Sequence, residues 1–121
     1  MTDRRTAKDS QQAEVAIADK LAERFGIQKV QAWQRQYAPR KLSVIEVEDK
    51  VAVLRPITAT EVSQYTMIYL SDGIDKAASF LLNELWIEGD KELIDCDDYF
   101  IPAMFEVDKI TSLKKSTFYK I

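Results

Sequence analysis

The sequence contains no histidine and only one cysteine, Cys96, among its 121 residues. Without histidine, neither a Ser-His-Asp triad nor a Cys-His pair can be assembled from this chain, and a histidine-based zinc site is excluded as well. A single cysteine can form no disulfide within one chain and no thiolate cluster, and a lone thiol suits a reducing cytoplasm. We therefore expect no catalytic residues, no cofactor and no metal, and a protein that acts by binding or assembly rather than as an enzyme.

Long apolar runs are also missing from the sequence. Residues 1–12 are polar and charged and lack the apolar core of a signal peptide. The longest apolar runs, 77–82 and 100–105, fall far short of the roughly 20 residues that span a bilayer. We expect a cytoplasmic protein without a membrane partner.

Glycine and proline are scarce, with three of each. Together with a hydrophobic content of 46%, this scarcity argues against a disordered or collagen-like chain. The three glycines are isolated from one another, so neither a P-loop nor a dinucleotide-binding turn can be drawn. The length suits one compact domain with its own core.

The charges are abundant but unevenly distributed. Residues 1–41 carry nine Lys or Arg and five Asp or Glu, a net charge of +4, whereas residues 42–121 carry eight and fifteen, a net charge of −7. Eleven of the acidic residues lie within 72–108, beside only two lysines. Such segregation indicates complementary contact between copies, and hence a homo-oligomer, or contact with a protein partner of matching pattern. Two solvated faces would explain it equally well.

Basic residues alternate with Trp33 and Tyr37 in the N-terminal third, a mixture that can bind nucleic acid. The two aromatic residues fall at core spacing, however, and the chain as a whole is acidic, with an isoelectric point near 5.0. We therefore expect no nucleic-acid partner.

The apolar periodicity predicts an α+β fold, mostly helical, with one antiparallel β-hairpin near residues 42–55. Residues 1–12 are expected to form a flexible charged arm, and residues 13–121 a single helical domain around the hairpin. The predicted helices cover 13–25, 30–37, 58–72 and 74–86, followed by a last helix that carries Phe100 and Val107. Residues 111–121 fit either a strand or a tail. Because an isolated hairpin is marginal in water, it must lie on helices or gain strands from a neighbouring copy.

Two local patterns are specific. The segment Thr58-Ala-Thr-Glu61 fits a capping box at the start of a helix. The helix over 74–86 has the clearest amphipathic pattern in the chain. The residues predicted to bind a protein partner are Leu81, Leu82, Leu85, Trp86, Tyr65 and Tyr69. The same spacing also fits a buried core, and both interpretations stay open.

The acidic segment 88–98 is the densest group of possible metal ligands. Its carboxylates are irregularly spaced, and the glycine at the sixth position of a calcium loop is missing. Asp95, Asp97 and Asp98 are better explained as residues that favour the N-terminus of a helix, by capping it and by opposing its dipole.

Residues 81–90 contain the pattern Leu-Leu-Asn-x-x-Trp-x-x-Gly-Asp, and Asp97-Asp98-Tyr99-Phe100 follows. Over roughly residues 33–110, the sequence resembles small proteins from phages and prophages of Bacteroides-type bacteria, some of which are labelled tail assembly chaperones. The resemblance implies a non-enzymatic protein that acts in the host cytoplasm. It would bind a long helical tape-measure protein in several copies until the tail tube forms. The alternative that we keep is a structural component of the virion or of the head-tail junction.

Overall fold

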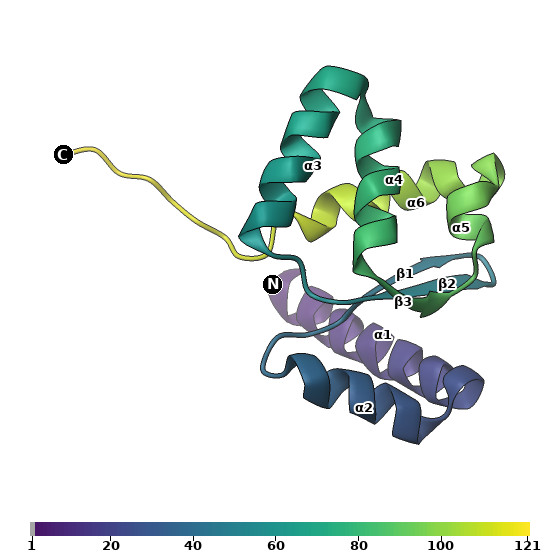
Figure 1. Cartoon of the computed structure of the whole chain (residues 1–121). Helices are drawn as coiled ribbons and strands as arrows, with labels where there is room; N and C mark the ends of the chain where they lie inside the picture. The colour runs from purple at the N-terminus through teal and green to yellow at the C-terminus, as the bar shows by residue number, and fades with distance from the viewer. Residues whose placement is uncertain (1) are drawn as a thin grey trace. The chain divides into compact units, whose positions relative to one another are not determined.

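The computed structural model describes residues 2–121, and the side chains of residues 11–121. Its elements are α1 (Thr2–Phe25), α2 (Ile27–Tyr37), β1 (Ser43–Val47), β2 (Lys50–Leu54), α3 (Ala59–Asp72), α4 (Ile74–Leu85), β3 (Trp86–Gly89), α5 (Glu92–Asp95) and α6 (Asp97–Ile110) (Figure 1). The fold is α+β and mostly helical, which confirms the predicted class. The predicted hairpin is also present, but it belongs to a three-stranded antiparallel sheet.

The chain forms two compact units, residues 1–39 and residues 40–121, where the sequence predicted one domain over residues 13–121. In the first unit, α1 and α2 pack on each other, and the rings of Phe25 and Trp33 meet edge to face at 5.7 Å. Apolar residues of this helical pair thus find partners within the pair itself. The backbone of α1 is helical from Thr2 onward, so it includes the segment predicted as an arm. The flexibility of that segment stays a prediction.

The sheet of the second unit has the order β1-β2-β3. The hairpin closes with Val47 opposite Lys50, and β3 pairs antiparallel to β2, with a register shift between Val53 and Leu54. The third strand was missed because Trp86 continues the helical spacing of α4 and acidic residues follow it. This strand and the helices supply the support that an isolated hairpin lacks.

Helices of the second unit cover one face of the sheet, as Figure 1 shows for α3 to α6. Ile45, Ala52 and Leu54 point from the sheet into the same core as Leu81, Leu82 and Leu85 of α4. From the other helices, Tyr65, Leu93, Phe100, Ala103 and Val107 join this core. Because burying an aliphatic side chain stabilises a fold by about 1.5–3 kcal/mol, this layer holds the unit together.

Gly89 lets β3 approach β2 closely. Its φ is +154°, and a Cβ atom added there would lie 2.4 Å from the carbonyl oxygen of Val51 and 2.7 Å from the Cα of Ala52. The next residue extends the pairing, since Asp90 N–H donates to the Val51 carbonyl and its carboxylate accepts from Val51 N–H, each at 2.8 Å. A side chain at position 89 would therefore push the third strand away.

We expect Gly89→Ala to lower the free energy of unfolding by about 3 kcal/mol or more, because backbone atoms must move to admit the methyl group. The matched control is Gly73→Ala, which also has a positive φ of +100° but meets only the end of the flexible Asp75 side chain at 3.2 Å. Gly73→Ala should cost about 1–2 kcal/mol from backbone strain alone, which is less than the loss expected for Gly89→Ala. Urea denaturation followed by circular dichroism measures both, and equal losses would contradict the close approach of the strands.

Candidate functional site

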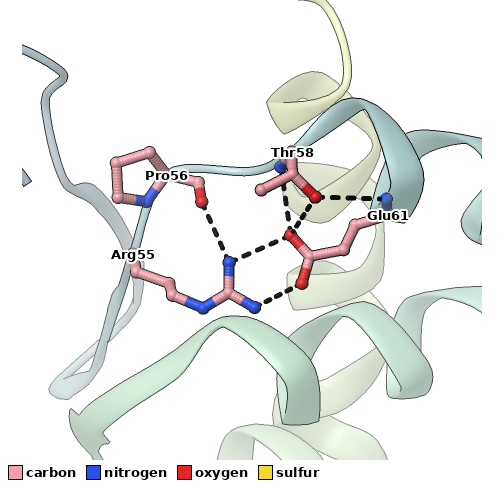
Figure 2. A network of polar contacts seen from close by, with 4 residues as sticks. All are labelled: Arg55, Pro56, Thr58 and Glu61. Carbon is pink, nitrogen blue, oxygen red and sulfur yellow. Dashed lines mark hydrogen bonds and ion pairs between the residues drawn. The ribbon is translucent and has the colours of Figure 1, made fainter.

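An ion pair fixes the start of α3 against the end of β2 (Figure 2). Arg55 directly follows β2 and points its guanidinium at the carboxylate of Glu61, in the first turn of α3. Nη1 of Arg55 donates to Oε1 of Glu61 at 2.9 Å and to the Pro56 carbonyl at 3.1 Å, while Nη2 donates to Oε2 of Glu61. The Glu61 side chain is only 9% exposed. Two parallel bonds of this kind give the pair a defined geometry.

The same carboxylate completes the capping box that the sequence predicted. Thr58 N–H and the Thr58 hydroxyl each donate to Oε1 of Glu61 at 3.0 Å, and Glu61 N–H donates to the hydroxyl oxygen at 3.4 Å. One glutamate therefore serves the helix cap and the ion pair together (Figure 2). The first turn of α3 is thereby tied both to itself and to the strand before it.

The hydrogen bonds from Arg55, assisted by those from Thr58, lower the pKa of Glu61 to about 2 against the opposing effect of burial. Because this pKa lies below the ordinary 4.5, the pair stabilises the fold fully above about pH 4.5 and is lost as the pH falls toward 2. We expect Glu61→Gln to cost about 2 kcal/mol at pH 7, since a neutral amide replaces the carboxylate that accepts the charge-assisted hydrogen bonds from Arg55.

The difference in free energy of unfolding between the natural chain and Glu61→Gln should shrink as the pH falls toward 2, because the natural carboxylate then becomes protonated and uncharged. Urea denaturation from pH 7 to pH 2.5 measures it. The control is Glu84→Gln on α4, an exposed position, where we expect a change within about 0.5 kcal/mol at pH 7. If the difference in free energy of unfolding between the natural chain and Glu61→Gln stays constant across this pH range, the ion pair does not stabilise the fold.

The structure separates the six residues predicted to bind a partner. Leu81, Leu82 and Leu85 are completely buried in the core, so they are not accessible to a partner in this conformation, and their role in binding stays a prediction. They are buried because β2, α3 and α6 all pack on α4 and occupy its apolar side. Trp86 is partly buried, and its ring lies 4.6 Å from Nζ of Lys91.

Tyr69 is different, because it belongs to an exposed apolar surface on α3. It is 42% exposed, while Met67 and Leu70 of the same helix are 68% and 80% exposed. We call these three residues the α3 surface. Sequence reasoning overlooked Met67 and Leu70, although the run Met67-Ile-Tyr-Leu70 gave a usable signal. Four consecutive apolar residues on a helix point in four directions, and a single core cannot bury all of them.

A groove of about 260 Å³ lies next to the α3 surface. Its lining comes from α3 and from the end of α6, namely Val62, Tyr65, Thr66, Tyr69, Leu70, Asp108 and Thr111. The rings of Tyr65 and Tyr69 lie 6.0 Å apart at a tilt of 53°. The groove is thus mainly apolar and aromatic, with one carboxylate from α6 at its edge.

Tyr65 joins the two helices that form the groove. The residue is 4% exposed, and its hydroxyl donates to Oδ1 of Asp108 at 2.9 Å. Burial, followed by the hydrogen bond to Asp108, raises the pKa of Tyr65. The phenol therefore stays protonated at neutral pH and keeps donating. Of the two tyrosines predicted to bind a partner, Tyr65 is buried and joins α3 to α6, whereas Tyr69 is partly exposed at the groove.

We expect Tyr65→Phe to lower the free energy of unfolding by about 1 kcal/mol, because the hydrogen bond is lost and the ring is kept. Asp108→Asn serves as the matched variant, since its amide oxygen can still accept from the phenol and the loss should be smaller. Thermal and urea denaturation compare the two. If Tyr65→Phe is neutral, the bond between α3 and α6 does not contribute to the groove.

The acidic segment 88–98 is occupied by structural contacts. Lys50 forms an ion pair with Glu92 at 3.1 Å. Asp97 and Asp98 lie in the first turn of α6, as predicted, but Asp95 ends α5, and the prediction that these residues cap the helix is wrong, because Cys96 is the N-cap and no side chain that the structure describes caps it. Among the side chains that the structure describes, no group of three or more Cys, Asp or Glu could hold a metal ion. The absence of a metal or cofactor in the natural protein stays a prediction.

Comparison with family models, with curated proteins and with solved structures finds no match to this chain. Within residues 2–121, no helix is both long enough and apolar enough to cross a bilayer.

Proposed function

We propose that this protein is a non-enzymatic assembly factor, similar to a phage tail assembly chaperone, that binds a helical segment of a client protein through the α3 surface and the adjacent groove. The observation that carries the proposal is the exposure of Tyr69 and Leu70 at the groove, with exposed Met67 one turn before Leu70 on the same helix. Exposed apolar side chains that gather beside a groove are typical of protein-binding surfaces.

The chemistry of the surface suits an amphipathic helix. Leu70 and Met67 are one turn apart and offer aliphatic contacts, while Tyr69 adds an aromatic ring of the kind that is enriched in binding hot spots. The groove beside them gives room for one or two apolar side chains of the client. A long helical tape-measure-like protein, as implied by the resemblance, would present many such segments.

The charge pattern of this region favours a client that carries basic residues beside its apolar stripe. Asp108 lies at the groove, and residues 72–108 carry eleven acidic residues against two lysines. Lysines or arginines beside the apolar stripe of a client helix would therefore be attracted to this region. Because such contacts lie at the surface, binding should weaken as the salt concentration rises.

The proposal is tested by joint production of this protein with the long coiled-coil protein that we expect to be encoded next to it. We expect the two proteins to co-purify. The double variant Tyr69→Ser, Leu70→Ser should bind at least tenfold more weakly, because two apolar anchors are lost at about 1 kcal/mol or more each. Its stability should stay within about 1 kcal/mol of the natural chain, since both positions are exposed.

Ile101→Ser is the matched control for this experiment, because Ile101 is 50% exposed on α6 but does not line the groove. It should leave binding unchanged. Equal capture by the natural chain and the double variant would contradict the α3 surface as the client site. Presence of this protein in finished particles at a fixed copy number would indicate the structural role instead, since a chaperone leaves before the particle is complete.

A further inference from the structure

Strand β1 is an edge of the sheet. The order β1-β2-β3 leaves one side of β1 without a strand among residues 2–121. An edge strand presents backbone N–H and C=O groups that can pair with an additional strand. A groove of about 350 Å³ runs beside it, lined by Ser43, Val44 and Ile45 of β1 and by Glu106, Lys109 and Ile110 near the end of α6.

Residues 112–121, which we call the extended segment, have no helix or strand in the structure. They lead away from the helices of their own unit (Figure 1). Leu113 lines the groove beside β1, but Phe118 and Tyr119 are 88% and 81% exposed. The sequence Thr117-Phe-Tyr-Lys-Ile121 is rich in β-branched and aromatic residues, which favour strands. The segment therefore has the composition of a strand but no partner strand within the described residues 2–121.

The charges of the two features are complementary. Residues 43–49, which include β1 and the turn after it, contain Glu46, Glu48 and Asp49 and no basic residue. The extended segment contains Lys114, Lys115 and Lys120 and no acidic residue. Opposite charges on facing strands stabilise their pairing, whereas like charges destabilise it.

The length of the segment is sufficient for pairing in another molecule. Its ten residues span about 33 Å when extended, whereas the five residues of β1 span about 17 Å. From these observations we propose that the extended segment of one copy of this protein adds as a strand to β1 of a second copy. Phe118 or Tyr119 then fills the groove next to Ile45. Reciprocal exchange of two segments closes a symmetric pair.

The proposal is tested on the full chain by size-exclusion chromatography with light scattering and by hydrogen-deuterium exchange over a range of concentrations. We expect a mass that rises toward twice 13.9 kDa as the concentration increases. Protection of the amides of residues 43–47 should rise in parallel. The double variant Phe118→Ser, Tyr119→Ser should remain at 13.9 kDa and lose this protection, without a loss of stability, because both side chains are exposed.

The control is the variant Tyr69→Ser, Leu70→Ser, which changes the α3 surface and should associate like the natural chain. A monomer at all concentrations without protection of β1 would overturn the proposal. Protection of β1 and of residues 116–121 in a monomer would also overturn it, since the segment would then pair within its own chain. Association that persists in the variant Phe118→Ser, Tyr119→Ser would overturn it as well.

Discussion

The ion pair between Arg55 and Glu61 is the interaction on which the second unit depends. It joins the last residue before the β2–α3 connection to the first turn of α3, and the same carboxylate caps the helix. An ion pair that is largely withdrawn from water contributes little net free energy compared with apolar packing, but it penalises every arrangement that separates its members. Its role here is to determine where α3 starts, and thereby which residues of α3 face outward.

The outward side of α3 and the edge of the sheet are two separate surfaces of the same unit. The first is a set of side chains on a rigid helix, held by Tyr65 against Asp108. The second consists mainly of backbone groups of β1 with a basic segment of complementary charge in the same chain. In the function that we propose, the first surface contacts the client and the second joins copies of the protein.

The sequence was sufficient to predict α2, α3, α4, α6, the second half of α1, the hairpin and the capping box, because periodicity and capping are local properties. It did not predict the short helix α5 or the start of α1. It was insufficient for β3, whose residues follow a helical pattern and become a strand only through pairing with β2. It also did not distinguish the buried apolar residues from the exposed ones. The strongest amphipathic pattern, that of Leu81 and Leu85, belongs to the most buried helix, whereas exposed Leu70 interrupts the pattern of α3. Periodicity thus identified what the protein buries, and the exposed apolar residues were those left over.

The direct succession of α4 and β3, with Leu85 ending the helix and Trp86 beginning the strand, has a consequence for the order of folding. The β1–β2 hairpin closes across two residues, but Leu54 and Trp86, which pair in the sheet, are 32 residues apart in the chain. Distant pairing of this kind is slower, because a longer loop must be closed first. We therefore expect the hairpin to form early with both of its edges open, and β3 to cover the β2 edge once α3 and α4 have docked.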